Sequence, residues 1–520
     1  PTTHRPNKAT EANDYSRHVE DLRALCNQRT TDSILFSATT QKRPRMNQAA
    51  VASNQEAGET ATAAWQRQPL LSIYYAFCSL QAYLAFERAA EMYITVDEAI
   101  TYADHIRPRL SGLFDFSAAN NHFLNSLLAK ALSTLAPYNE LAIRLPSLAI
   151  GAWFFFYYLP RRIQQPLRLL LLTCLCLLPY YISEYWSMSR GYFMSTCFAA
   201  AAVLELMQAT GEHHPSRSTT EAQALLWAQL YGSLSVLASF VMLPFSLCIS
   251  AACLGIHRPT QQSPLAWLPR NPGLWVTILT AGFSYRAIRT FQASGEALAK
   301  GNSMSFTTPI DAVAAGGLVG WPWLATAYLG LLILALAWCG WKRQSHQLIA
   351  IATVLGSIAL LWLGGTITGG FPIERSWIPY WFPLCVLISL PLSTPIELRP
   401  RTQTAFGLLA AGLAMANTSH WYTPDYSYYW RSNYYQAKAL FYYESKGVDY
   451  CLEDVFKYDW VLRFYWDDPK SAVKQPRDCR PGEHSPLGFT NFEVPGKTFK
   501  FPEKIWGKHA DGRVMPDETK

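Results

Sequence analysis

Long apolar segments separated by short polar connections constrain this chain more than any other feature. A helix that crosses a bilayer needs about 20 apolar residues, because the hydrocarbon core is about 30 Å thick. About eleven segments meet this requirement: 69–88, 141–160, 166–184, 191–209, 223–240, 242–256, 273–291, 321–341, 347–366, 376–394 and 403–419. A single water-soluble enzyme is excluded, and we predict an all-α polytopic membrane protein.

The polar ends of the chain lower its mean hydropathy, so the average does not reflect the apolar middle. Half of the 520 residues are apolar and 16% are charged, yet the mean hydropathy is only +0.02. Residues 1–68 show no helical or strand periodicity, so we expect a disordered cytoplasmic segment there. Residues 69–419 form the predicted transmembrane domain. Residues 420–520 are polar but rich in aromatic side chains, and we expect a small mixed α/β domain outside the membrane.

The distribution of Lys and Arg predicts the orientation of the spans, because these residues favour the cytoplasmic side. Eleven spans place one set of cations inside: Arg161, Arg162, Arg168, Arg217, Arg258, Arg270, Lys342, Arg343, Arg399 and Arg401. A smaller set lies outside after the first loop: Arg190, Arg286, Arg289, Lys300 and Arg375. A twelfth span would exchange the two sets. We therefore predict that the first loop, 87–140, and the C-terminal tail lie on the outer face.

One helical stretch in the first loop is too polar to be a span. Residues 122–138 include Asn125 and Lys130, and their leucines fall on one helical face. Such a segment is typical of a helix that lies in the membrane interface. We predict that it belongs to a subdomain of outer interfacial helices.

Net charge and cysteine content exclude two other classes of protein. The formal net charge is +7, but no basic stretch alternates with stacking aromatic residues, so we expect no nucleic-acid partner. Most of the eleven Cys lie inside apolar segments, where they act as small hydrophobic residues. Cys451 and Cys479 are outside them and can form a disulfide on an oxidising side. The sequence leaves open whether they pair.

Two adjacent carboxylates open the first outer loop. Asp97 and Glu98 follow the first span directly, and charges are costly to place near hydrocarbon. In one interpretation both are solvated and only cap the loop. In the other, one accepts a proton from a hydroxyl group, while the second orients the acceptor or holds a cation.

Three motifs in a fixed order resemble one family of membrane enzymes. They are Asp97-Glu98 after the first span, Asn120-Asn121-His122 before the amphipathic stretch, and Arg144-Leu145-Pro146-Ser147 at the second span. The region 69–395 resembles the GT-C glycosyltransferases, in particular the protein-mannosyltransferase-like and aminoarabinose-transferase-like branch that uses polyprenyl-phosphate sugars. Asn-Asn-His replaces the Lys-Pro-Pro of the aminoarabinose branch, so a lysine contact to the lipid phosphate is not expected there.

The resemblance implies a GT-C type of fold and an inverting hexosyl- or pentosyltransferase. The donor would be a sugar on a polyprenyl monophosphate, and the acceptor a hydroxyl of a glycan, lipid or protein on the outer face. Asp97 would be the general base, and Glu98 would orient the acceptor or hold a cation. Asn121, His122 and Tyr102 would contact the acceptor or the sugar.

The outward arginines need a separate explanation. Arg190, Arg286, Arg289 and Arg375 oppose the charge asymmetry of the spans. They can extend to the interface or pair with Glu184 and Glu374, or they can bind an anionic ligand. Guanidinium groups bind phosphate oxygens in bidentate fashion, so we predict that this set binds the lipid phosphate.

The sequence leaves alternatives open for the cofactor, the function and the membrane. His122 can be a metal ligand beside the two carboxylates, although a hydrogen-bonding role is more common, and a divalent cation is the one cofactor considered. A transporter or flippase for a lipid-linked or small anionic substrate is the alternative function, but transporters tend to show internal repeats and charges near the midplane. We expect a bacterial inner membrane with the site on the periplasmic face, and the endoplasmic reticulum is the other possibility.

Overall fold

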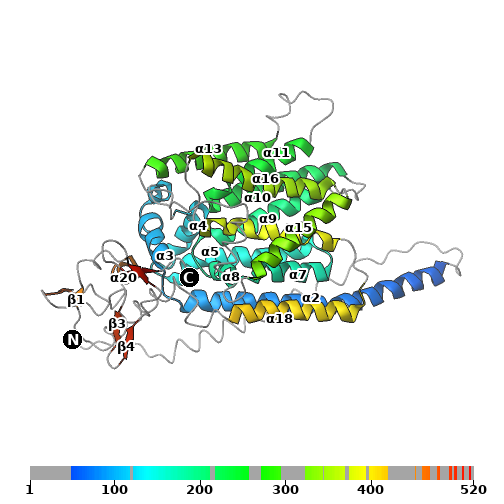
Figure 1. Cartoon of the computed structure of the whole chain (residues 1–520), viewed down its shortest axis with the longest axis horizontal. Helices are drawn as coiled ribbons and strands as arrows, with labels where there is room; N and C mark the ends of the chain where they lie inside the picture. Colours follow the sequence, from blue (N-terminus) through cyan, green and yellow to red (C-terminus); the bar gives the residue numbers. More distant parts are fainter. Residues whose placement is uncertain are drawn as a thin grey trace, which may run out of the picture. The chain divides into compact units, whose positions relative to one another are not determined.

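The structure is a computed structural model. It describes residues 49–116, 121–210, 217–256, 271–293, 323–342, 345–368, 374–393, 398–419, 451–452, 460–468, 477–480, 491–494, 497–500, 506–508 and 514–516. Pro1–Ala64 and Trp65–Lys520 form separate compact units, and the helical bundle belongs to the second. Helices dominate the described part (Figure 1), as predicted.

Most predicted spans coincide with one helix. Two do not: 166–184 divides into the helices Pro166–Leu177 and Tyr180–Trp186, and 376–394 contains an α-helix only over Trp381–Ile388, between two 3-10 segments. The main helices are α2 (Ala49–Glu91), α5 (Glu140–Ala152) with its continuations η3 (Trp153–Tyr158) and α6 (Leu159–Arg162), α7 (Pro166–Leu177), α9 (Gly191–Thr210), α10 (Arg217–Ala238), α11 (Leu243–Ile256), α13 (Pro272–Ala293), α15 (Trp323–Lys342), α16 (Ser345–Thr368), α17 (Trp381–Ile388) and α18 (Pro400–Ser419). Among the described residues, four helical segments are long and apolar enough to cross a membrane: Pro69–Glu91, Glu140–Arg162, Gly191–Thr210 and Gln347–Ile367. The helical character of the segments is confirmed, and the count of eleven crossings stays a prediction.

Shorter elements connect these helices. They are α3 (Val96–Thr101), the π-helical turn η1 (Tyr102–Ile106), η2 (Leu110–Phe114), α4 (Phe123–Ser133), α8 (Tyr180–Trp186), η4 (Phe240–Met242), η6 (Glu374–Tyr380), η7 (Leu390–Ser393) and α20 (Trp460–Trp466). The apolar run 223–256 divides after α10, where Ser239 takes an extended conformation before η4. The predicted division of this run into two helices is therefore confirmed.

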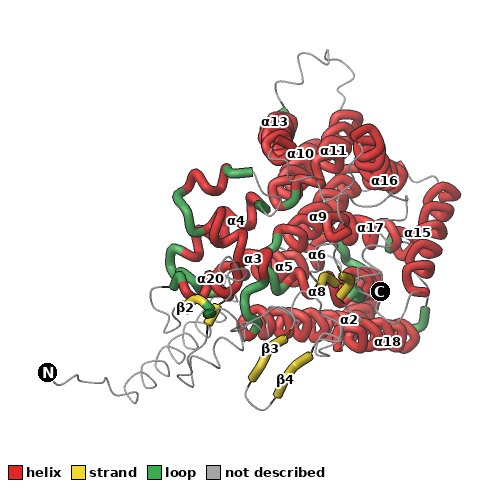
Figure 2. The backbone as a smooth tube through the Cα atoms, turned by 60° about the vertical axis from the view of Figure 1, so that its left-hand side comes forward, coloured by secondary structure: helices red, strands yellow, loops and turns green. Residues whose placement is uncertain are grey.

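Helix α9 is the centre of the bundle. It packs against α5, α10, α11, α16 and α17, and Figure 2 shows these neighbours around it. Four consecutive alanines, Ala199–Ala202, are fully buried. Small residues let neighbouring helix backbones approach closely in a membrane protein. Nearly every residue of α9 is buried, so the residues at its start have a rigid support.

Contacts between helices show which helix ends lie together at each end of the bundle. At the first-loop end, defined by the end of α2 and the starts of α5 and α9, the His122 Nδ1 atom lies 3.1 Å from the carbonyl oxygen of Ala238 at the end of α10. Phe283 at the middle of α13 packs against Phe123 there. At the opposite end, the Tyr158 hydroxyl donates to Glu205, 2.9 Å away. This grouping agrees with the predicted alternation of the helices.

Helix α4 has the polarity expected of an interfacial helix. Its buried side consists of Asn125, Ser126, Ala129 and Ser133. Its leucines are half-buried or exposed, and Leu135 just beyond the helix is 84% exposed. The polar face therefore packs on the bundle, while the apolar face is available to lipid.

Most of the C-terminal tail lies outside the described residues. Its described strands pair as β1 (Cys451–Leu452) with β2 (Arg477–Asp478), β3 (Asn491–Val494) with β4 (Lys497–Lys500), and β5 (Trp506–Lys508) with β6 (Val514–Pro516); only the first pair is parallel. Cys451 and Cys479 form a disulfide, with their Cα atoms 4.7 Å apart. A separate mixed α/β domain stays a prediction. Of the segment 1–68, residues 49–68 belong to helix α2 rather than to a disordered segment, and residues 1–48 lie outside the described residues.

The predicted orientation can be tested by thiol labelling. Arg109 in the first loop and Arg161 at the other end are both exposed. A membrane-impermeant maleimide should modify Arg109→Cys in intact cells and Arg161→Cys only after permeabilisation, with the wild type as the background control. The reverse pattern would invert the topology.

Candidate functional site

The first turn of α3 sets the directions of Asp97 and Glu98. Thr95 caps the helix: its Oγ1 accepts a hydrogen bond from the Glu98 N–H at 3.3 Å, and its own N–H donates to Glu98 Oε2 at 3.1 Å. This reciprocal arrangement is a capping box. An α-helix has about 3.6 residues per turn, so adjacent side chains leave it in different directions. The two carboxylates therefore meet different surroundings.

Glu98 forms a buried ion pair with Arg144. Arg144 Nε donates to Oε1 at 2.9 Å and Nη2 donates to Oε2 at 2.7 Å, and neither side chain is exposed. The Ser189 N–H also donates to Oε1, at 2.6 Å. No open side of this carboxylate faces solvent, so Glu98 does not have the position expected of a direct acceptor contact.

Arg144 also ties the start of α5 to the end of α2. Its guanidinium donates to the carbonyl oxygens of Ala89, Met92 and Tyr93, at 2.9, 2.6 and 3.1 Å. These carbonyls lie where α2 ends and the chain turns towards α3, and an arginine can satisfy several acceptors at once because its donors spread in a planar fork. The arginine of the Arg-Leu-Pro-Ser motif thus fixes the path of the chain that leads to Asp97.

The environment of Glu98 keeps it ionised. Burial alone would raise the pKa of this carboxyl, but the positive charge of Arg144 and hydrogen bonds from Arg144, Ser189 and Thr95 outweigh it, and the pKa lies below its usual range. A buried carboxylate with several donors is stabilised in this form. Glu98 is therefore suited to hold its neighbours in place.

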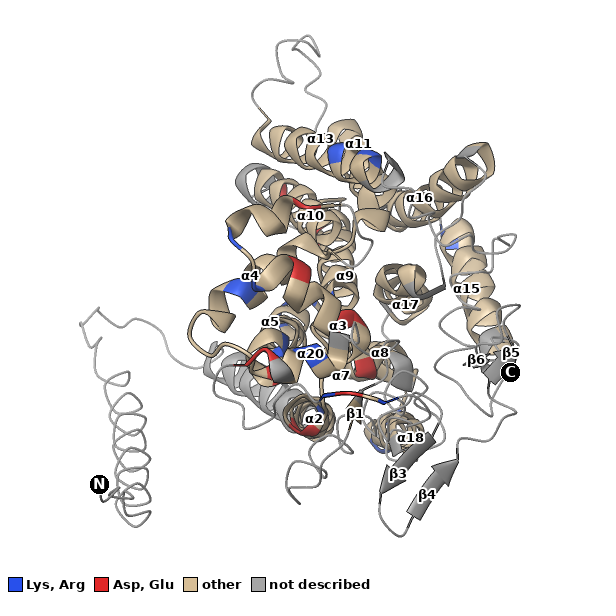
Figure 3. Cartoon of the chain, turned by 90° about the vertical axis from the view of Figure 1, so that its left-hand side faces the viewer, with Lys and Arg blue, Asp and Glu red and all other residues tan. Residues whose placement is uncertain are grey.

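Asp97 turns to another partner and keeps contact with solvent. Its Oδ2 lies 3.3 Å from Arg190 Nη2, and the exposed fractions of the side chains are 22% for Asp97 and 2% for Arg190. The Arg190 guanidinium also lies over the ring of Tyr192, 5.4 Å from its centroid. In Figure 3 the ribbon of α3 lies beside that of α20, and the two helices are in contact. The structure thus pairs two candidate residues that are far apart in the sequence.

The chain just before α9 is held from several sides. Asn125 Nδ2 donates to Ser189 Oγ at 3.0 Å. A Cβ atom at Gly191 would lie 2.0 Å from the carbonyl oxygen of Ala238, so only glycine fits this close approach. Arg190 lies between these two anchored positions. Glu98 is the residue after Asp97, and its carboxylate accepts a hydrogen bond from Ser189, the residue before Arg190. The Glu98 carboxylate therefore helps to position both Asp97 and Arg190.

His122 and Asn121 lie next to this segment. His122 is buried, and its ring packs edge-on against Tyr192, with centroids 4.5 Å apart. Asn121 Nδ2 donates to the carbonyl oxygens of Leu113 and Asp115, both at 2.9 Å. Within the described ranges, no group of three His, Cys, Asp or Glu side chains is placed to hold a metal ion.

Tyr102 lines a pocket next to α20. Its hydroxyl accepts a hydrogen bond from the Tyr138 N–H at 3.0 Å, and its ring packs edge-on against Phe464 of α20. Burial raises the pKa of Tyr102. Asp97 does not line this pocket. Tyr102 is thus separated from the group around Asp97 and Arg190.

The other candidate arginines are more dispersed. Arg286 and Arg289 are exposed on α13, beyond Phe283, at the first-loop end. Arg375 belongs to η6, which packs along α9, but its side chain lies outside the described residues. Arg190 is therefore the one member of the set whose guanidinium the structure brings to Asp97 within the described ranges.

Sequence reasoning missed the supporting residues. The sequence places Arg144 in a motif, and the only signal for its ion pair is that the preceding loop carries the adjacent acids Asp97 and Glu98. Arg88 at the end of α2 pairs with Glu184 of α8 at 3.3 Å. No sequence pattern identified that pair or Ser189, because the partners come from separate helices.

Comparison with known proteins identifies a related fold. No protein-family model and no curated protein sequence matches the chain. Its structure is similar to the crystal structure of ArnT from Cupriavidus metallidurans in the apo state, with a TM-score of 0.52 and 11% sequence identity. The match covers 80% of this chain and 90% of ArnT. This likeness supports the predicted GT-C type of fold, and the particular branch stays a prediction.

Proposed function

We propose that this protein is a glycosyltransferase that moves a sugar from a polyprenyl monophosphate to a hydroxyl acceptor at the first-loop end of the bundle. The observation that carries the proposal is the pairing of partly exposed Asp97 with buried Arg190 at that end. The fold likeness to ArnT, a GT-C aminoarabinose transferase, supports the same general kind of reaction.

Asp97 acts as the general base in this proposal. The acceptor oxygen attacks the anomeric carbon of the donor sugar as its proton passes to the Asp97 carboxylate. The bond from the anomeric carbon to the phosphate oxygen breaks, and its electron pair leaves with the polyprenyl phosphate. A single displacement of this kind inverts the anomeric centre. The partial exposure of Asp97 supports access of an acceptor from water.

Arg190 stabilises the leaving phosphate. Its guanidinium is almost fully buried, and charge-assisted hydrogen bonds are stronger where water is excluded. The developing charge on the phosphate would then meet a donor that is already in place. Arg286, Arg289 and Arg375 are proposed to guide or hold the lipid phosphate from the same end.

Glu98 is proposed as a positioning residue, because its contacts fix the residues next to Asp97 and Arg190. Asn121 and His122 are proposed to contact the sugar, because His122 packs on Tyr192, two residues after Arg190. A divalent cation is not required by this proposal. We expect the site to face the periplasm across a bacterial inner membrane, with a glycan, lipid or protein hydroxyl as the acceptor.

Replacement of Arg190 tests the phosphate contact. Arg190→Ala should weaken donor binding by about 1.5–3 kcal/mol, the value of a hydrogen bond to a charged group. Arg190→Lys should restore only part of the affinity, because lysine cannot form the planar fork. Titration of the purified protein with a synthetic polyprenyl-phosphate sugar measures both effects.

Arg109→Ala removes an exposed arginine of the first loop that is not proposed to contact the phosphate, and it serves as the control. It should change donor affinity less than Arg190→Ala does. Donor affinity that is unchanged in Arg190→Ala would remove Arg190 from the phosphate site. Binding of a lipid-linked sugar by the wild type without transfer to any acceptor would instead favour the transporter or flippase.

A further inference from the structure

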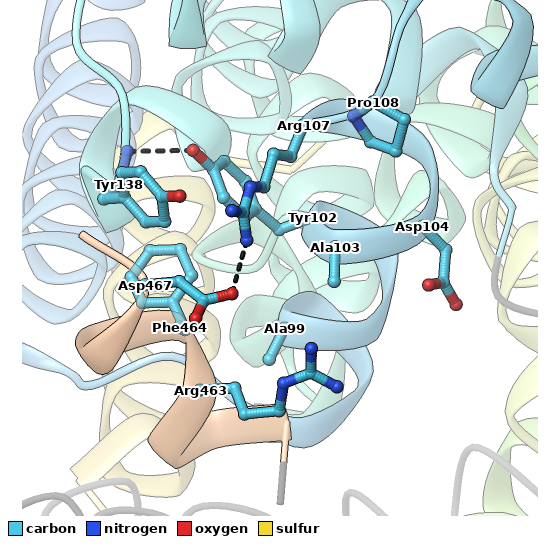
Figure 4. A pocket seen from close by; sticks show the side chains of 10 residues that line it. All are labelled: Ala99, Tyr102, Ala103, Asp104, Arg107, Pro108, Tyr138, Arg463, Phe464 and Asp467. Atoms are coloured by element: carbon cyan, nitrogen blue, oxygen red, sulfur yellow. Dashed lines mark hydrogen bonds and ion pairs between the residues drawn. The ribbon is translucent and has the colours of Figure 1, made fainter. Parts of the chain in front are cut away.

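A pocket of about 360 Å³ lies between the first loop and α20. Ala99 and Ala103 are four residues apart and therefore share one face of the chain at the centre of the pocket, where their small side chains leave room (Figure 4). Arg463, Phe464 and Asp467 of α20 line the side contributed by the tail. The pocket exists only when segments from opposite ends of the sequence come together.

Two ties hold these segments to each other. Arg107 of the first loop forms an ion pair with Asp467 at the surface. Deeper in, the Tyr465 hydroxyl donates to Glu140 Oε1 at 2.8 Å and accepts from the Ile94 N–H at 3.0 Å. The tail is therefore anchored directly to the loop that carries Asp97.

Charge in this pocket is balanced. Arg107 and Arg463 line it together with Asp104 and Asp467, so the formal charges cancel. A site built for a phosphate or carboxylate would carry excess positive charge. The four charged side chains lie around Ala99 and Ala103 and offer hydrogen-bond donors and acceptors. Such groups suit a neutral ligand that is rich in hydroxyl groups.

Aromatic side chains form the other wall. Phe464 packs against Tyr102 and Tyr138, with ring centroids 5.0 and 5.8 Å apart. A sugar ring has an apolar face of C–H groups and an edge of hydroxyls. Aromatic rings can pack on the C–H face of the sugar, and charged groups can hydrogen-bond to its hydroxyls. A few polar groups on a largely apolar lining are typical of ligand pockets.

The backbone at Tyr138 is strained. Its φ of 56° is in the left-handed region, which is uncommon for residues other than glycine. Its N–H donates to Tyr102, and the Arg107 guanidinium lies over its ring, 5.6 Å from the centroid. Such strain costs about 1–3 kcal/mol and concentrates at ligand sites. Tyr138 is thus held in position in the pocket wall at an energetic cost.

We propose that this pocket binds a neutral saccharide unit of the acceptor, distant from the hydroxyl that reacts. The inference rests on the proposed function and names its substrate class. Ala99 lies in the pocket, whereas Asp97, two residues earlier on α3, faces Arg190. Residues two apart on an α-helix point to roughly opposite sides. An acceptor that reaches both must extend across α3, so it is an oligosaccharide or a longer glycan.

Binding to a printed array of neutral mono- to tetrasaccharides tests the proposal on the purified full-length protein. The wild type should bind oligosaccharides. Ala103→Phe fills the pocket, and Arg107→Ala removes one of its charged lining side chains. Each variant should weaken saccharide binding roughly tenfold or more. Arg109→Ala removes an exposed arginine of the same loop that does not line the pocket, and it should bind as the wild type does.

Donor affinity in the same variants separates the two proposals. Ala103→Phe and Arg107→Ala should bind a synthetic polyprenyl-phosphate sugar normally, and with a glycan acceptor they should raise KM more than they lower kcat. No saccharide bound by the wild type, or unchanged binding in Ala103→Phe, would overturn the saccharide pocket and leave the proposed transferase intact. If the wild type does not bind the polyprenyl-phosphate sugar, the result counts against the proposed transferase instead.

Discussion

Asp97→Asn is expected to lower sugar transfer by roughly 10²–10⁴-fold, the usual contribution of a positioned general base. Asparagine keeps the size of the side chain but cannot accept the acceptor's proton. Because Asp97 is partly exposed and Glu98 holds α3 in place, the variant should fold and bind the lipid donor. Release of polyprenyl phosphate from a synthetic donor, with native membranes as the acceptor source, measures the rate.

The matched control is Glu91→Gln, which neutralises an exposed carboxylate at the end of α2. Its rate should equal that of the wild type, because Glu91 lies outside the group around Asp97 and Arg190. Near-normal transfer by Asp97→Asn would show that another group accepts the proton.

Glu98→Gln is expected to destabilise the fold by about 3–5 kcal/mol, because it leaves the Arg144 guanidinium buried without its counter-charge. The folded pKa of Glu98 lies below the usual value of about 4.3, so the ion pair stabilises the protein above that pH. This stabilisation is lost as the pH falls through the folded pKa. Thermal unfolding in detergent, followed by tryptophan fluorescence, measures both effects.

Asp467→Asn provides the comparison for stability. It breaks the ion pair with Arg107, in which the side chains are 47% and 33% exposed for Arg107 and Asp467. An exposed pair of this kind contributes about 0–1 kcal/mol. Equal destabilisation by the two variants would mean that burial does not set the importance of the Glu98–Arg144 pair. A double variant, Glu98→Leu with Arg144→Met, should recover much of the loss.

The helices were predictable because the bilayer imposes a length on each apolar segment. The divided run between Arg217 and Ile256 and the amphipathic helix α4 followed from the same reasoning. The candidate residues Asp97 and Arg190 were also within reach of sequence reasoning, since each is a charge at the predicted outer edge of a span. Such arguments use only local periodicity and the cost of charge near hydrocarbon.

The partnerships between those residues could not be predicted. Asp97 and Glu98 are adjacent and chemically alike, and only the capping box at Thr95 and the position of Arg144 make one buried and the other partly exposed. The resemblance groups Tyr102 with Asn121 and His122 as an acceptor or sugar contact. In the structure it lies with α20, from the other end of the chain. Contacts between distant segments carry no local pattern.

Sugar transfer by the purified wild type tests the central claim most directly. The protein, reconstituted in lipid nanodiscs, is given a panel of synthetic polyprenyl-phosphate sugars with native membrane glycans as acceptors, and NMR of the product gives its anomeric configuration. We predict that one donor yields a glycoside of inverted configuration together with an equal amount of polyprenyl phosphate. A product of retained configuration would contradict the single displacement, and no product from any lipid-linked sugar would contradict the proposed transferase.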